Sequence, residues 1–115
     1  GVAFSHDGKL LAASSRDGTV YLWQVAGNHP EKLQPLDAPN SSYGLTSVAF
    51  SPVANLLAAG DADGSIYVWN VTNRTMTTRV DSGGGEVNSV AFSGDGKLVG
   101  AGDALGRVFT WPIGA

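Results

Sequence analysis

The sequence predicts an all-β protein, an array of β-propeller blades, and three observations lead to this fold class. A segment that begins Val-Ala-Phe-Ser and ends in tryptophan occurs three times, with its last residue at Trp23, Trp69 and Trp111. Each copy divides into short apolar or β-branched runs separated by Gly, Asp and Asn, which is typical of strands joined by tight turns. No apolar series at helical spacing is present. Repeats of about 40–45 residues are supersecondary units that bury their faces by stacking on neighbours.

The middle copy shows the expected strands most clearly, over residues 45–51, 56–60, 65–71 and 75–80. The first alternates, with Val48 and Phe50 on one face and Ala49 on the other. The second is short, small and apolar. The third is rich in β-branched and aromatic residues, which favour strands. The fourth is the most polar. Turns are expected at 52–55, at 61–64, where Gly64 would take a positive φ, and at 72–74.

Side-chain size predicts how the strands are arranged. The second strands are built on Ala12-Ala13, Ala58-Ala59 and Gly100-Ala101, whereas the third strands carry the large aromatic residues. Small residues suit the crowded strands near an axis, and large ones suit the strands farther out. The third strand of the middle copy is apolar on both faces, so a further layer is expected on each side. Radially arranged four-stranded sheets meet that requirement, and this arrangement is a β-propeller.

The chain is expected to form one partial propeller over residues 1–115, with about two and a half to three blades. The blade segments are approximately 1–37, 45–81 and 87–113. The first connection is long and contains Pro30, Pro35 and Pro39, and residues 31–36 within it are expected to form a short outer strand. The second connection, around residues 81–85, is short and rich in glycine.

The recurring Val-Ala-Phe-Ser, Asp-Gly-Lys-Leu, Asp-Gly-Thr-Val and Trp resemble the WD-repeat (tryptophan-aspartate repeat) family of β-propellers. The resemblance covers nearly the whole chain and implies blades of four antiparallel strands that serve as scaffolds for protein partners. The repeat-defining structural residues are then Trp23, Trp69, Trp111, Asp17 and Asp63.

Several positions depart from the family pattern. The closing Trp-Asp pair is Trp23-Gln24, Trp69-Asn70 and Trp111-Pro112 in this chain, and Leu105 takes the place expected for the third turn aspartate. The network of Trp, Ser/Thr, His and Asp that many family repeats carry is therefore expected to be absent. The blades would then depend on packing and turn geometry.

The order of the strands suggests how the array is completed. The chain opens on a first strand and stops after a third, which in this family resembles the C-terminal piece of a larger propeller. The alternative is that copies of the chain assemble into a closed ring, with two chains giving six blades. Missing blades or a homo-oligomer would therefore complete the ring.

Composition excludes several function classes. The net charge is −3 without a cluster of Lys or Arg, so nucleic acid is not an expected partner. No apolar run approaches the ~20 residues of a membrane helix. The absence of cysteine excludes disulfides and thiolate metal sites and fits a cytoplasmic protein. The acceptor-like motifs at Asn40, Asn70 and Asn73 are interpreted as ordinary turn composition.

No catalytic, cofactor or metal site is expected. The segment at 61–65 resembles part of a calcium loop but lacks the distant Glu, so it is interpreted as a tight turn. The glycines at 83–85 lack the Lys-Ser/Thr of a phosphate loop. A catalytic triad would need a nucleophile and a carboxylate that converge on one of the two imidazoles. His6 lies in a turn position that Pro52 and Gly94 fill in the other copies, and His29 precedes Pro30 in a loop, so neither is expected to be catalytic. The chain is therefore not predicted to be an enzyme, and a propeller hydrolase is the less favoured alternative.

The predicted function is a non-enzymatic protein-interaction scaffold, and the resemblance implies a signalling or regulatory protein. A protein or peptide partner is expected on the loops at one end of the propeller, because loops on a rigid scaffold often carry binding. The candidate contact residues follow second strands or lie before or within first strands; they are Arg16, Tyr43, Asp61, Glu86, Asn88 and Asp103. The alternative is a purely structural role, in which the blades self-assemble into a closed ring.

Overall fold

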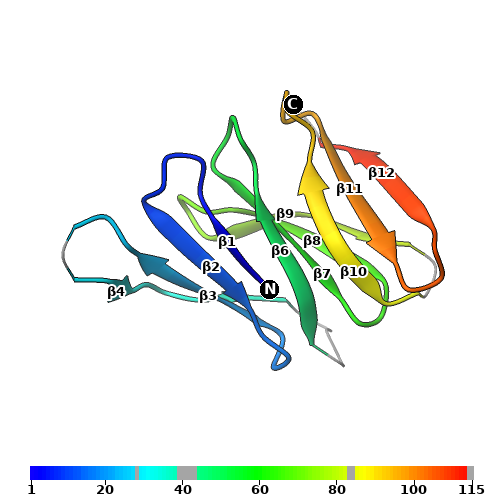
Figure 1. Cartoon of the computed structure of the whole chain (residues 1–115), viewed down its shortest axis with the longest axis horizontal. Coiled ribbons are helices and arrows are strands. Elements are labelled where there is room, and N and C mark those ends of the chain that lie inside the picture. The colour runs from blue at the N-terminus through cyan, green and yellow to red at the C-terminus, as the bar shows by residue number, and fades with distance from the viewer. Residues whose placement is uncertain (28, 39–43, 83–84, 114–115) are drawn as a thin grey trace.

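The protein is all-β, and its computed structural model describes residues 1–27, 29–38, 44–82 and 85–113. The strands form three antiparallel sheets standing side by side (Figure 1). In chain order they are β1 (Val2–Phe4), β2 (Leu10–Ser14), β3 (Thr19–Gln24), β4 (Glu31–Lys32), β5 (Leu36–Asp37), β6 (Leu45–Phe50), β7 (Leu56–Asp61), β8 (Ser65–Asn70), β9 (Thr75–Asp81), β10 (Val87–Phe92), β11 (Leu98–Asp103) and β12 (Val108–Pro112).

The strand order within each sheet follows the chain, as expected when tight turns join neighbouring strands. The first sheet has the order β1-β2-β3-β4, with β5 also paired to β3. The middle sheet has the order β6-β7-β8-β9, and the third has β10-β11-β12. The prediction of four antiparallel strands is confirmed in its simplest form by the middle sheet.

The outer strand predicted at residues 31–36 is split into two short pieces. β4 pairs with β3 at Trp23 and Gln24, and β5 pairs with β3 at the other end, at Thr19 and Val20. Pro35 lies between the two pieces and has no N–H to donate to a ladder. The segment therefore follows the edge of β3 with an interruption.

The innermost strands β1, β6 and β10 run side by side through the centre of the array (Figure 1). The hydroxyl of Thr46 on β6 donates to the carbonyl of Val87 on β10, which ties the middle sheet to the third. The outer strands then fan away from this line, as the blades of a propeller do.

Two apolar cores lie between the three sheets. The core between the first and middle sheets contains Ala12, Val20, Leu22, Leu36, Ala38, Leu45, Val48, Leu57, Ala59, Tyr67, Trp69 and Val71. The core between the middle and third sheets contains Ala58, Ile66, Val68, Val87, Val90, Val99 and Ala101. The prediction that the third strand of the middle copy is covered on both faces is therefore confirmed.

The three repeat tryptophans occupy equivalent positions but differ in burial. Trp69 is 2% exposed in the first core. Trp111 is partly buried against the second core. Trp23 lies on the face of the first sheet that no neighbouring sheet in the described residues covers. Position in the array decides how much each tryptophan contributes to stability.

Candidate functional site

Several loops meet at one end of the array, along the lower edge of Figure 1. They are the β2–β3, β7–β8 and β11–β12 turns and the segments that enter β6 and β10. Three backbone hydrogen bonds connect them: Leu45 N–H to the Ser15 carbonyl at 2.9 Å, Ala62 N–H to the Gly44 carbonyl at 3.1 Å, and Ala104 N–H to the Glu86 carbonyl at 2.8 Å. These bonds fix the turns relative to the inner strands, so this loop end is a defined surface.

A hollow of about 330 Å³ opens at the loop end. Its lining consists of Gly1, Ser14, Arg16, Leu45, Thr46, Glu86 and Asn88. Three of the predicted contact residues are thus brought together from two segments, Arg16 from the β2–β3 turn and Glu86 and Asn88 from the start of β10. All three are exposed. The hollow therefore presents a guanidinium, a carboxylate and an amide to solvent.

The two charges in the hollow are available for a partner. Within the described residues, the ion pairs are Arg79 with Asp81 and Arg107 with Asp103, and neither includes Arg16 or Glu86. An exposed charge keeps its hydration until a partner replaces it, so such residues favour orientation and specificity.

Two other predicted contact residues, Asp61 and Asp103, are buried, at 1% and 7% exposure. One oxygen of Asp61 accepts hydrogen bonds from the backbone N–H groups of Asp63 and Ser65, at 3.0 and 2.7 Å. Its other oxygen accepts from the Tyr67 hydroxyl at 2.9 Å. These carboxylates fold the turns beneath the loop surface. The remaining candidate, Tyr43, lies outside the described residues.

The turn aspartates of the middle and third copies differ in the part they take in the turn. In the middle copy Asp61 accepts the bonds that hold the turn, and Asp63 contributes its N–H. The third copy does have a turn carboxylate, Asp103, which accepts the N–H groups of Leu105 and Arg107 at 3.0 and 2.9 Å. In these two copies the carboxylate at the end of the second strand reaches N–H groups two and four residues ahead.

The first copy builds the same turn differently. Ser15 occupies the position of Asp61 and Asp103, and its hydroxyl accepts the Asp17 N–H at 3.2 Å. Asp17 then accepts the Thr19 N–H at 3.0 Å and the Tyr21 hydroxyl at 2.7 Å. The bond from Tyr21, together with further hydrogen bonds in the turn, lowers the pKa of Asp17. Asp17 thus holds this turn through its carboxylate.

A polar network crosses the middle sheet, contrary to the expectation that packing and turn geometry would act alone. It starts at the Asp61–Tyr67 hydrogen bond, and the Arg79 guanidinium lies 5.6 Å from the centre of the Tyr67 ring. Burial first, and then the bond to Asp61, raises the pKa of Tyr67. Ser65 donates to Asp81, which also pairs with Arg79 at 3.5 Å. This network uses residues other than the His and Ser/Thr of the family pattern.

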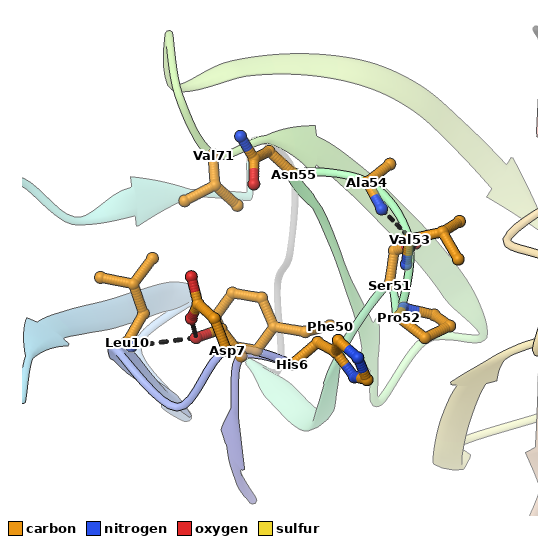
Figure 2. A pocket seen from close by; sticks show the side chains of 11 residues that line it. His6, Asp7, Leu10, Phe50, Ser51, Pro52, Val53, Ala54, Asn55 and Val71 are labelled. Atoms are coloured by element: carbon orange, nitrogen blue, oxygen red, sulfur yellow. Dashed lines mark hydrogen bonds between the residues drawn. The ribbon is translucent and has the colours of Figure 1, made fainter.

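A second hollow, of about 320 Å³, lies at the opposite end between the first two sheets (Figure 2). It brings Ser5, His6 and Asp7 to one rim, which are the residue types of a hydrolase triad. The Ser5 hydroxyl donates directly to Asp7 at 2.7 Å. The imidazole of His6 is turned away from that carboxylate (Figure 2). A triad requires the imidazole to lie between the hydroxyl and the carboxylate.

The third copy shows what this Ser-Asp pair does. Ser93 donates to Asp95 at 2.6 Å in the equivalent turn, where Gly94 takes the place of His6. The bond from the neighbouring serine lowers the pKa of both carboxyls, Asp7 and Asp95. A pair that recurs without the histidine is a turn motif, so this hollow has the geometry of a structural turn.

His29 is exposed in the first connection. Among the described residues no group of three or more His, Cys, Asp or Glu gathers as metal ligands would. In the same part of the chain, no helix has the length and hydropathy needed to cross a membrane.

Comparison with protein families identifies the family of this chain. The family described as WD domain, G-beta repeat matches residues 1–24, 31–70 and 74–111. The chain belongs to the WD-repeat family. WD repeats generally mediate protein–protein interaction and typically act as non-enzymatic scaffolds. Comparison with curated proteins gives no match.

The WD repeats are offset from the sheets by one strand. The second matched repeat, 31–70, starts at β4, which belongs to the first sheet, and ends with β8 in the middle sheet. The third, 74–111, starts at β9 in the middle sheet and ends within β12. Each of these repeats therefore supplies an outer strand to the preceding blade, which links neighbouring blades through the chain itself.

Sequence reasoning missed Ser14, Leu45 and Thr46 in the loop-end hollow. Their signal was positional, because each stands where a first strand begins or a second strand ends. In antiparallel hairpins these points lie at the same end of the sheet. Applying that rule to all three repeats would have placed Ser14, Leu45 and Thr46 together at the loop end.

Proposed function

We propose that this WD-repeat chain binds a segment of a partner protein at the loop end, in the hollow between Arg16, Glu86 and Asn88. The observation that carries the proposal is that the exposed Arg16 of the β2–β3 turn meets the exposed Glu86 and Asn88 at the start of β10. Arg is a preferred interface anchor. Loops held by a rigid scaffold often carry binding, and a polar hollow on that scaffold gives the partner a fixed orientation.

The chemistry of the hollow specifies the partner segment. Arg16 can form a bidentate pair with a carboxylate, so the segment would place an Asp, a Glu or a chain terminus beside it. Glu86 favours a lysine, an arginine or an amide donor on the same segment. We propose a ligand with an acidic and a basic group a few residues apart. The family also leads us to place the protein in signalling or regulation.

A displayed library of random peptides provides the test. Peptides selected on the wild-type chain are remeasured by calorimetry on the Arg16→Glu variant, because charge reversal at an exposed site leaves the fold intact. Loss of a charged anchor at an interface typically costs about 1–3 kcal/mol, or roughly 5- to 150-fold in affinity. We expect acidic–basic peptides to dominate the selection and to lose affinity by this amount.

The matched control is Lys9→Glu, which also reverses an exposed charge but lies in the β1–β2 turn at the opposite end. Peptides that bind Lys9→Glu as well as the wild type support the loop end. Peptides that bind Arg16→Glu undiminished and fail on Lys9→Glu would place recognition at the other end and overturn the proposal.

A further inference from the structure

The two outermost sheets each present an apolar face that the described residues do not cover. On the first sheet Val2 and Phe4 are 71% and 63% exposed. On the third sheet Val108 and Leu98 are 79% and 40% exposed. Large apolar side chains left exposed on a sheet face indicate a candidate site of association.

The two uncovered faces are of different kinds. Strand register assigns each residue to a face, because neighbours across a ladder lie on the same side. The aromatic face of the first sheet consists of Val2, Phe4, Leu11, Ala13, Tyr21 and Trp23. The small-residue face of the third sheet consists of Ser89, Ala91, Leu98, Gly100, Gly102, Val108, Thr110 and Pro112.

The molecule already joins these two kinds of face twice. In the first core, Leu57 and Trp69 from the aromatic face of the middle sheet pack with Ala12, Val20 and Leu22 of the first sheet. The second core repeats the pairing. There Val99 and Trp111 of the third sheet pack with Ala58, Ile66 and Val68 of the middle sheet.

Each exposed residue has a buried counterpart in these cores. By register, Phe4 corresponds to Phe50, which packs against the first core. On the other face Val108 corresponds to Ile66, which is fully buried in the second core. The uncovered faces therefore carry the residue types that meet elsewhere in the array.

The glycines of β11 strengthen the argument. Gly100 corresponds to the fully buried Ala58, and Gly102 corresponds to Gly60. Neither Gly100 nor Gly102 has a positive φ. A Cβ added to Gly100 would meet no atom closer than 3.5 Å. Glycine weakens a strand interior, and in such a place it often marks a close approach by another chain segment.

We infer that the aromatic face of one copy of this chain packs on the small-residue face of a second copy, head to tail. The chain carries both halves of the interface, so two copies can cover all four faces at once. Their six sheets fall within the range of about 4–8 blades in β-propellers. A closed pair also satisfies symmetry, because a head-to-tail contact that fails to close adds copies without limit.

Sedimentation equilibrium over a concentration series tests this assembly. We expect the wild type to have twice the 11.8 kDa mass of one chain. Phe4→Ser removes an anchor from the aromatic face, and Gly100→Val fills the small-residue face with a residue that strands favour. Each variant should weaken the association by about 30-fold or more.

Matched controls separate the interface from general effects. Gly100→Ala should keep the two-chain mass, because Ala58 is tolerated at the equivalent buried position. Val53→Ser removes an exposed apolar side chain from a turn rather than a sheet face and should also have no effect. Mixing Phe4→Ser with Gly100→Val should partly restore pairing, because one intact aromatic face then meets one intact small-residue face.

Other outcomes overturn the inference. A folded wild-type chain that keeps the mass of one copy at every concentration would assign the two faces to blades outside this chain. A two-chain species unaffected by Gly100→Val would indicate that faces of the same kind pair with each other. Assemblies of more than two chains would exclude a ring closed by two copies. The inference is independent of the proposed peptide site, because Arg16→Glu should keep the two-chain mass whatever it does to peptide binding.

Discussion

The middle and third sheets use different residues to bind the turn carboxylate and to place a cation beside the neighbouring aromatic ring. In the middle sheet Asp61 accepts a hydrogen bond from Tyr67, and Arg79 on the outer strand β9 lies over that ring. In the third sheet the equivalent aromatic is Phe109, which has no hydroxyl. Arg107 takes over both tasks, since it donates to Asp103 at 2.8 Å and lies 5.2 Å from the centre of the Phe109 ring.

The difference shows what a blade requires. A turn carboxylate needs a side-chain donor, and the aromatic residue beside it is accompanied by a cation. The first sheet also follows this rule, because Lys32 on β4 lies 4.9 Å from the centre of the Tyr21 ring. In the first two sheets the cation comes from an outer strand. In the third sheet the cation is Arg107, the residue just before β12. The carboxylate, its side-chain donor and the cation therefore all come from β11, β12 and the turn between them.

The largest expected effect comes from the environment of the repeat tryptophans. Trp69→Ala should lower the free energy of unfolding by about 3–5 kcal/mol, because a fully buried ring leaves a cavity. Trp23→Ala should cost clearly less, because its face is open in a single chain. Urea unfolding of both variants in the Gly100→Val background, which is expected to be monomeric, measures the difference. Equal losses would mean that the first sheet is covered even in one chain.

A glycine pair should give the next largest effect. A Cβ on Gly60 would lie 2.3 Å from Cγ1 of the buried Val87 in the third sheet. Gly60→Ala should therefore destabilise the protein by about 1–3 kcal/mol through overpacking. On Gly102 the nearest atom to an added Cβ is Ser89 Oγ at 3.6 Å. In the Gly100→Val background, which is expected to be monomeric, Gly102→Ala should be neutral or slightly stabilising in thermal melts. An equal loss from both substitutions in that background would contradict the stacking described for Gly60.

Acid titration of the turn carboxylates gives the smallest effect. Burial alone would raise the pKa of Asp103, but hydrogen bonds from the backbone and side chain of Arg107 bring it below the ordinary 3.8. A lowered folded pKa stabilises the protein above the unfolded pKa, and this contribution is lost as pH falls below about 3.8. Asp103→Asn should therefore be less stable at neutral pH and lose less on acidification.

Chemical denaturation at a series of pH values between about 7 and 2 measures this slope. Asp7, Asp17 and Asp95 also have lowered pKa values, so some acid sensitivity should remain in the variant. An unchanged slope in Asp103→Asn would mean that the Arg107 pair does not distinguish the folded from the unfolded state.

Much of the fold could be predicted from the sequence because each blade is a local structure. Alternating residues, small second strands and turn glycines placed the strands of the middle sheet to within about one residue at each end. The split of the outer strand around Pro35 was harder to predict, since both pieces pair with β3 and only the ladder shows where pairing stops. The part that Asp61 takes in its turn could not be told from that of Asp63 by residue type alone.

The candidate site was only partly predictable. Arg16, Glu86 and Asn88 could be predicted to share one end, because they precede or follow strands of known direction. Their convergence on one hollow depends on how the inner strands pack side by side. The burial of Asp61 and Asp103 also depends on geometry, because the same side chain faces solvent or the turn according to the donors within its reach.

The sequence by itself determined the repeat, the strand order, the turns and the two kinds of sheet face, since these follow from residue spacing within about forty residues. The tertiary structure alone decided which tryptophan is buried, which charges meet at the loop end and which faces stay uncovered. The physical reason is that burial belongs to pairs of sheets. Trp23 and Trp69 stand at equivalent positions in repeats of one pattern, and only the neighbouring sheet makes one a core residue and leaves the other available for contact.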